Sequence, residues 1–132
     1  MAPPVKVFIC DDVPELRKLI RCELEADPAL RVVGEAADGA GGIAGVIQTC
    51  PDAILLDLSM PGIDGLEALP VIRKVAPQAA LLVFSGFAEE RLGEVSLARG
   101  ADRYLQKDQP PEAVRQAVLE AVAERRLDGA AP

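Results

Sequence analysis

The chain has 132 residues, which suits a single compact domain, and half of them are hydrophobic, enough to fill one core. Histidine is absent, so His-dependent catalytic triads and His-containing zinc sites are excluded within this chain. The formal net charge of −7 argues against direct binding to duplex DNA, because such binders carry a basic surface.

The sequence shows neither the apolar core of a signal peptide nor an apolar run long enough to span a membrane. Its three cysteines, Cys10, Cys22 and Cys50, are odd in number and have no Cys-x-x-Cys spacing. This pattern is typical of free thiols in a reducing compartment. We therefore expect a cytoplasmic protein without disulfides and without contact with a membrane.

Short apolar runs alternate five times with segments of helical period, which predicts strand–helix units around a parallel sheet. The expected strands are residues 5–10, 31–36, 53–58, 80–84 and 102–106. The expected helices are residues 14–26, 39–50, 65–75 and 89–99, and a last helix with an apolar stripe at Val114, Ala117, Val118, Ala121 and Val122. We expect one domain over residues 1–127, with residues 128–132 as a flexible tail or the start of a linker.

Three of the expected helices contain residues that disfavour helices, and Gly93 is such a residue in the helix at 89–99. Pro70 lies inside the helix at 65–75, where it removes one backbone hydrogen bond, so we expect a kink there. Asp64 and Glu67 form a capping pair that favours the start of the same helix. Several glycines lower the helix propensity of residues 39–50, so the helix there is expected to be weak.

The polarity of the strands predicts their order in the sheet. The first, third and fourth strands are almost wholly apolar, as expected when helices cover both faces, whereas the second and fifth carry charge and belong at the edges. Right-handed crossovers then give the order 2-1-3-4-5, a doubly wound α/β fold of the flavodoxin-like type. In such a sheet the binding crevice lies beyond the carboxyl ends of the strands.

Polar side chains stand at these carboxyl ends in four of the five strands. They are Asp11, Asp12, Asp57, Ser85 and Lys107. Two carboxylates at 4 Å repel each other by roughly 4 kcal/mol at an effective dielectric near 20, so three of them together need a cation. Magnesium prefers oxygen ligands of this kind. The sequence therefore predicts a divalent metal site at this edge.

Asp57 is reached through an apolar strand and is expected to be partly buried. A carboxylate there can act as a nucleophile toward phosphorus, giving an aspartyl phosphate. Lys107 can contact one phosphoryl oxygen as a point charge, and the Ser85 hydroxyl can donate to another. Each residue alone also has a structural interpretation as a turn, cap or edge residue. Their joint placement favours an active site for phosphoryl transfer by positioning and charge.

The motifs at these positions resemble the receiver domains of two-component response regulators, the CheY-like family. The resemblance covers residues 5–126 and rests on residues 7–12, 51–65 and 100–107 together with Ser85. Residues 32–39 and the pair Lys107-Asp108 resemble the NarL/LuxR-type branch of that family.

The resemblance implies a role for each matching residue. Asp57 corresponds to the phosphoacceptor. Asp11, Asp12, Asp57 and the backbone carbonyl of Ser59 correspond to the ligands of Mg²⁺ or Mn²⁺.

The resemblance also implies a switch. Lys107 corresponds to the lysine that contacts the phosphoryl group, Ser85 to the switching hydroxyl and Tyr104 to the rotating aromatic residue. The fourth helix, fifth strand and fifth helix would form the surface that switches conformation when Asp57 is phosphorylated.

By the same resemblance, the phosphoryl donor is a histidine kinase or phosphotransfer protein, which fits a chain with no histidine. The domain would control an output domain or partner, and a homodimer on phosphorylation is possible. This chain would not touch nucleic acid itself; DNA would be bound only through a helix-turn-helix output domain that the chain does not contain. Either the receiver stands alone or such a module has been removed.

Three rival interpretations remain open. A phosphatase of the haloacid dehalogenase type also uses a strand-end aspartate with magnesium, but it has a second Asp two residues later, where this chain has Ser59. A flavodoxin-like cofactor binder needs a phosphate-binding loop where Asp11 and Asp12 stand. A degenerate receiver would serve only as an interaction module. We expect a signalling phosphoacceptor, not an enzyme, with self-phosphorylation and slow autodephosphorylation as its only reactions.

Overall fold

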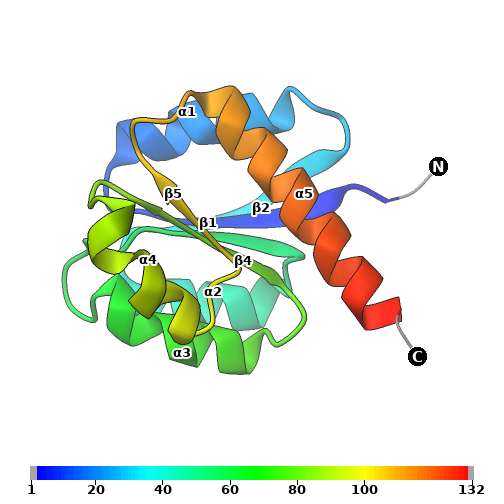
Figure 1. The fold of residues 1–132 in the computed structure, drawn as a ribbon. Helices are drawn as coiled ribbons and strands as arrows, with labels where there is room; N and C mark the ends of the chain where they lie inside the picture. Colours follow the sequence, from blue (N-terminus) through cyan, green and yellow to red (C-terminus); the bar gives the residue numbers. More distant parts are fainter. Residues whose placement is uncertain (1–2, 131–132) are drawn as a thin grey trace.

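The computed structural model describes residues 3–130 as a five-stranded sheet between two layers of helices (Figure 1). All neighbouring strands are parallel, in the predicted order β2-β1-β3-β4-β5. The strands are β1 (Val5–Cys10), β2 (Leu30–Ala36), β3 (Ala53–Leu56), β4 (Ala80–Ser85) and β5 (Arg103–Gln106). The helices are α1 (Pro14–Glu25), α2 (Gly39–Thr49), α3 (Gly65–Val75), α4 (Glu89–Ala98) and α5 (Pro111–Ala130).

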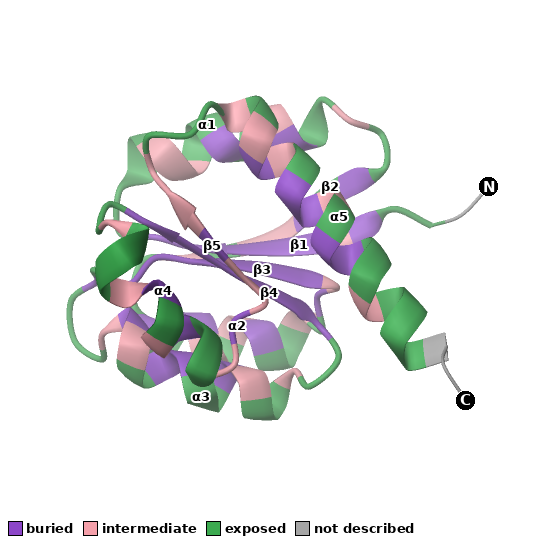
Figure 2. Cartoon of the chain, viewed as in Figure 1, coloured by how far each residue is buried: buried purple, intermediate pink, exposed green. Residues whose placement is uncertain are grey.

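Alternating side chains of each strand fill two separate cores. Helices α1 and α5 cover one face of the sheet, and α2 and α3 cover the other, with α4 against β5 (Figure 1). On β1, for example, Val7 and Ile9 pack in the first core, whereas Phe8 and Cys10 pack in the second. Strands β3 and β4 are buried throughout, and β2 and β5 are partly exposed (Figure 2). The predicted inner and edge strands are therefore confirmed.

Two element ends differ from the sequence-based prediction by two residues or more, and the other predicted ends agree within one residue. Strand β3 ends at Leu56, two residues earlier than predicted, so Asp57 is the first residue of the following loop. Helix α5 continues to Ala130 and includes Asp128, where the sequence predicted a tail. Residues 131 and 132 of that tail lie outside the described residues. No helix within residues 3–130 has the length and apolar character needed to cross a membrane.

The glycines of α2 allow this helix to lie close to β1. A Cβ at Gly45 would lie 2.3 Å from the ring of Phe8, far inside van der Waals contact. The same residues that lower the helix propensity of α2 are therefore required for its packing, and burial of this face stabilises the helix.

Helix α3 runs through Pro70 without interruption. Because proline has no N–H, the carbonyl of Leu66 loses its donor within the helix. Arg99, the C-cap residue of α4, supplies a replacement: its Nη1 donates to the Leu66 carbonyl at 2.7 Å. The internal proline thus links α3 to the end of α4.

Candidate functional site

The predicted site residues meet at the carboxyl edge of the sheet. Asp11 and Asp12 follow β1, and Asp57 follows β3. Ser85 is the last residue of β4, and Lys107 follows β5. The three carboxylates each present an oxygen, and these oxygens all lie within 4.8 Å of one another. The parallel sheet therefore gathers acids that are far apart in the sequence, as predicted.

Two of the three acids are buried and held in place by backbone amides. Asp57 is 2% exposed and Asp11 is 4% exposed, whereas Asp12 is exposed. The N–H of Val13 donates to Oδ1 of Asp11 at 2.9 Å, and the N–H of Ser59 donates to Oδ1 of Asp57 at 3.2 Å. These bonds fix the orientation of each carboxylate and bring the Ser59 peptide to the site. The predicted use of the Ser59 carbonyl as a metal ligand stays a prediction.

Lys107 is the cation of the cluster. Its Nζ lies 2.8 Å from Oδ2 of Asp11 and 3.4 Å from Oδ2 of Asp57. The ammonium also lies 5.8 Å from the centre of the Phe84 ring, within range of a cation–π interaction. One ammonium does not balance three carboxylates, so the cluster keeps an excess of negative charge that a divalent cation can neutralise.

Burial and the neighbouring charge of Asp11 raise the pKa of Asp57 from 3.8 to about 6. Lys107 and the N–H of Ser59 oppose this increase because they favour the ionised form. At neutral pH Asp57 is therefore still mostly ionised, which is the form that can attack phosphorus.

The loop after β3 depends on a glycine. A Cβ at Gly65, the first residue of α3, would lie 2.3 Å from the carbonyl oxygen of Asp57. The N–H of Gly65 also donates to the carbonyl of Leu58 at 3.0 Å. Asp64 caps α3 as predicted, with its Oδ1 accepting from the N–H of Glu67 at 2.8 Å. Helix α3 therefore begins directly against the Asp57 backbone and fixes its position.

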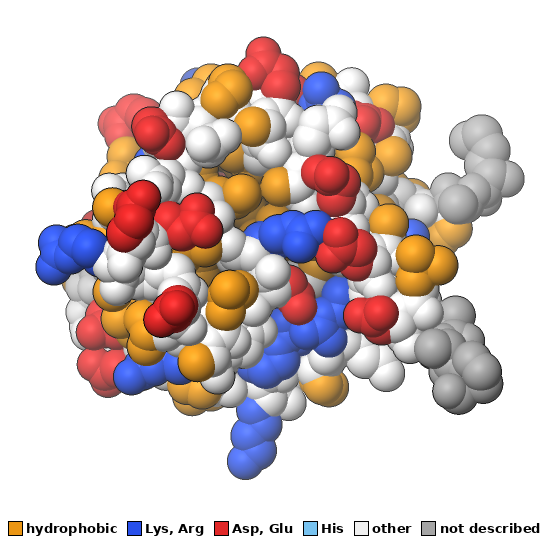
Figure 3. Space-filling model, viewed as in Figure 1, with side chains coloured by type: hydrophobic (Ala, Val, Ile, Leu, Met, Phe, Trp, Pro, Cys, Tyr) orange, Lys and Arg blue, Asp and Glu red, His pale blue; other side chains and the backbone are white. Residues whose placement is uncertain are grey.

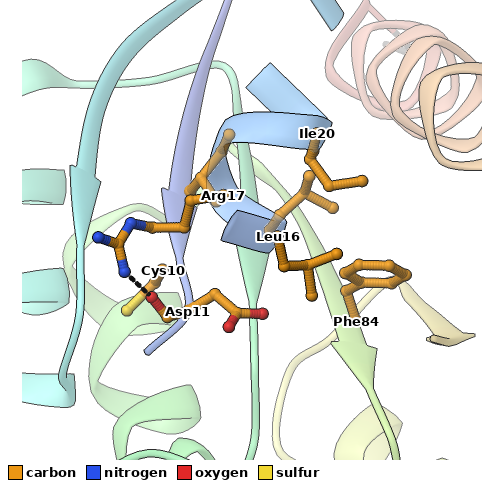
Figure 4. A pocket seen from close by; sticks show the side chains of 8 residues that line it. Cys10, Asp11, Leu16, Arg17, Ile20 and Phe84 are labelled. Atoms are coloured by element: carbon orange, nitrogen blue, oxygen red, sulfur yellow. Dashed lines mark hydrogen bonds between the residues drawn. The ribbon is translucent and has the colours of Figure 1, made fainter. Parts of the chain in front are cut away.

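A small cavity of about 10 Å³ lies beside Asp11. Leu16 and Ile20 of α1 face Phe84 of β4 across it, and the guanidinium of Arg17 donates to the Asp11 backbone carbonyl (Figure 4). An apolar space of this size holds at most one water molecule and is expected to be dry. The side of Asp11 toward α1 is thus lined mainly by apolar side chains, whereas its carboxylate contacts Lys107 at the carboxyl edge.

Ser85 and Tyr104 are joined through the backbone of Phe87. Ser85 is fully buried, and its Oγ accepts from the N–H of Phe87 at 3.1 Å. Tyr104 is 8% exposed, and its hydroxyl donates to the carbonyl of Phe87 at 2.8 Å. Tyr104 therefore already lies inside the protein. The sequence did not predict this use of the Phe87 backbone, because no sequence pattern reports which backbone groups of a loop the side chains of a strand will reach.

A family model of the response regulator receiver domain matches residues 7–119. The chain belongs to this family. The receiver is 40% identical over 120 residues to the nitrate/nitrite response regulator protein NarL of Escherichia coli K12, covering 91% of this chain and 56% of that protein. It is 34% identical over 128 residues to a protein-glutamate methylesterase/protein-glutamine glutaminase of Geobacter sulfurreducens, covering 96% of this chain and 35% of that protein.

Solved receivers have the same fold. A two-component response regulator of the LuxR family from Aurantimonas sp. SI85-9A1 has a TM-score of 0.87 and 30% sequence identity, over 93% of this receiver and 88% of that chain. The NarL/LuxR-type branch predicted from the motifs is confirmed by these relatives. The receiver spans little more than half the length of NarL, 56% of it.

Proposed function

We propose that this receiver domain accepts a phosphoryl group on Asp57 from a histidine kinase or phosphotransfer protein and passes the signal to an output domain or partner. The observation that supports this proposal is the cluster of Asp11, Asp12 and Asp57, with Lys107 between two of them. An ionised, buried carboxylate next to a cation and further acids is the arrangement that phosphoryl transfer by positioning and charge requires.

In the proposed reaction, a carboxylate oxygen of Asp57 forms a bond to phosphorus as the bond between phosphorus and the donor imidazole nitrogen breaks. The leaving imidazole takes up a proton from solvent. Lys107 moves its contact from the carboxylates to a phosphoryl oxygen. The Ser85 hydroxyl already accepts from Phe87, and its own proton is then donated to another phosphoryl oxygen.

The acid cluster fits Mg²⁺ or Mn²⁺, since its donors are carboxylate oxygens and its net charge is negative. We assign the metal to Asp11, Asp12, Asp57 and the Ser59 carbonyl. Bound there, the ion would supply positive charge next to the phosphoryl group. The protein's own contribution is to hold Asp57 and Asp11 in fixed orientations through backbone N–H groups.

We assign the output of the domain to the surface formed by α4, β5 and α5. Figure 3 shows acidic and basic side chains interspersed with hydrophobic ones on this side of the molecule. Arg103 of β5 pairs with Glu124 of α5 at 2.6 Å across this surface. By analogy with NarL/LuxR-type relatives, its partners would be a second copy after phosphorylation or a DNA-binding output domain beyond this chain.

The test is phosphorylation of the purified chain by acetyl phosphate or phosphoramidate in the presence of magnesium, followed by intact-protein mass spectrometry. We expect the wild type to gain one phosphoryl group, Asp57→Asn to gain none, and the exposed control Asp128→Asn to behave as wild type. A wild type that gains no mass would indicate a degenerate receiver that serves as an interaction module. Continuous release of phosphate from p-nitrophenyl phosphate would instead indicate a phosphatase.

A further inference from the structure

Helix α4 is weakly anchored by its own side chains. Its buried residues are Gly93 and Ser96, so no large apolar side chain of this helix is fully buried. The hydroxyl of Ser96 is the one buried side-chain polar atom without a partner within residues 3–130. The N-cap residue, Ala88, has no side chain that can accept a hydrogen bond. Because packing provides most of the stability of a helix in a protein, the position of α4 depends on contacts from outside it.

Strand β5 supplies those contacts at the start of α4. Tyr104 and Gln106 are two residues apart and therefore lie on the same face of the strand. Tyr104 donates to the carbonyl of Phe87 at 2.8 Å. The side-chain oxygen of Gln106 accepts from the N–H of Glu89, the first residue of α4, at 3.0 Å. Gln106 thus satisfies an amide of the first turn in place of a conventional N-cap side chain.

Gln106 also adjoins the phosphorylation site. It lies opposite Ser85 in the β4–β5 pair, and the next residue, Lys107, donates its N–H to the Ser85 carbonyl at 2.8 Å. One side chain therefore connects the strand ends that carry Ser85 and Lys107 to the first turn of α4. Phe87 lies two residues before this turn, and its backbone N–H and carbonyl bond to Ser85 and Tyr104, respectively.

We propose that Gln106 is a positioning residue. Its side-chain amide caps α4 from the neighbouring strand, and the cap keeps the Phe87 carbonyl where it accepts the hydrogen bond from the buried Tyr104. The link of this cap to signalling rests on the proposed function, since Ser85 and Lys107 are its phosphoryl-contacting residues.

The chain itself provides a probe for this proposal. It contains one tyrosine and no tryptophan, so intrinsic fluorescence reports on Tyr104 alone. Gln106→Met keeps the length of the side chain but removes the acceptor, whereas Gln106→Glu keeps an acceptor oxygen. Gln78→Met is the matched control, because Gln78 is exposed in the loop at the opposite edge of the sheet.

In unphosphorylated protein, we expect Gln106→Met to increase acrylamide quenching of Tyr104 at least about twofold and amide exchange of Glu89 at least about fivefold. Gln106→Glu and Gln78→Met should stay within experimental error of wild type in both measurements. Equal quenching and exchange in wild type and Gln106→Met would overturn the proposal, as would failure of Gln106→Glu to restore them.

Two further measurements decide the role of Gln106 even if Gln106→Met does not fold or if the wild type is not phosphorylated. If Gln106→Met does not fold, a nuclear Overhauser effect between the Gln106 side-chain amide and the Glu89 N–H in wild type supports the cap, and its absence contradicts it. Phosphorylation by acetyl phosphate is measured separately by mass. A wild type that takes up no phosphoryl group refutes the proposed function, whereas the quenching and exchange data still decide the role of Gln106.

Discussion

Replacing Asp57 with asparagine is expected to stabilise the unphosphorylated protein at neutral pH when no divalent ion is present. Burial and the charge of Asp11 raise the pKa of Asp57 from 3.8 to about 6, a difference that corresponds to ~3 kcal/mol of unfavourable free energy for the ionised form in the folded state. Asparagine has nearly the same shape and removes this charge. Lys107 loses a contact of 3.4 Å to Asp57 but keeps the one of 2.8 Å to Asp11, so we expect a net gain of about 2 kcal/mol.

The sign of the pH dependence gives a sharper test. Because the pKa of this acid is higher in the folded than in the unfolded state, the folded protein binds the extra proton between these two values. The destabilisation is therefore complete above the folded pKa of about 6 and disappears as the pH falls toward 3.8. The stability difference between Asp57→Asn and wild type should shrink accordingly as the pH is lowered.

The assay is urea unfolding followed by circular dichroism, in EDTA, at several values between about pH 7.5 and pH 4.5. Asp128→Asn serves as the exposed control and should change stability by less than ~0.5 kcal/mol. An Asp57→Asn variant less stable than wild type at neutral pH would refute this reasoning, and so would an advantage that stays constant with pH. Adding magnesium should stabilise the wild type more than the variant, because the ion neutralises the charge that the variant lacks.

Three other outcomes are expected. Asp102→Asn should lower the free energy of unfolding by about 2–3 kcal/mol in urea titrations, because Arg73 at 2.9 Å and Arg125 at 2.8 Å lose a partly buried carboxylate; unchanged stability would contradict this. Gly65→Ala should slow phosphorylation by acetyl phosphate at least about tenfold, since its Cβ would lie 2.3 Å from the carbonyl oxygen of Asp57, whereas Gly129→Ala, with open space around it, should not. Chelating divalent ions should stop mass gain in the wild type, and restored magnesium should recover it.

The sequence predicted the features that follow from burial and topology. The polarity of the strands was sufficient to place β2 and β5 at the edges, and parallel pairing then placed Asp11, Asp57 and Lys107 together. The end of β3 was less well predicted, because an apolar loop residue such as Leu58, which is buried, has the same pattern as a strand residue.

The hydrogen bonds and close contacts between different helices and strands could not be predicted from the sequence. Gln106 and Arg99 are residue types that are common on protein surfaces. Their hydrogen bonds to the backbone of Glu89 and Leu66 depend on how α4 lies against β5 and α3. The same holds for the steric need for Gly65, which reflects the entry angle of α3. Periodicity reports which face of an element is buried, but it does not report which backbone groups of another element a side chain will reach.

The bond from Arg99 to the carbonyl freed by Pro70 makes two distant positions mutually dependent. Restoring an N–H at position 70 would give Leu66 a local donor and make the bond from Arg99 unnecessary, whereas removing the arginine alone would leave this exposed carbonyl to bond water. A double-mutant cycle at these positions should therefore be non-additive. In an evolving lineage, a change at one position would alter the effect of a change at the other.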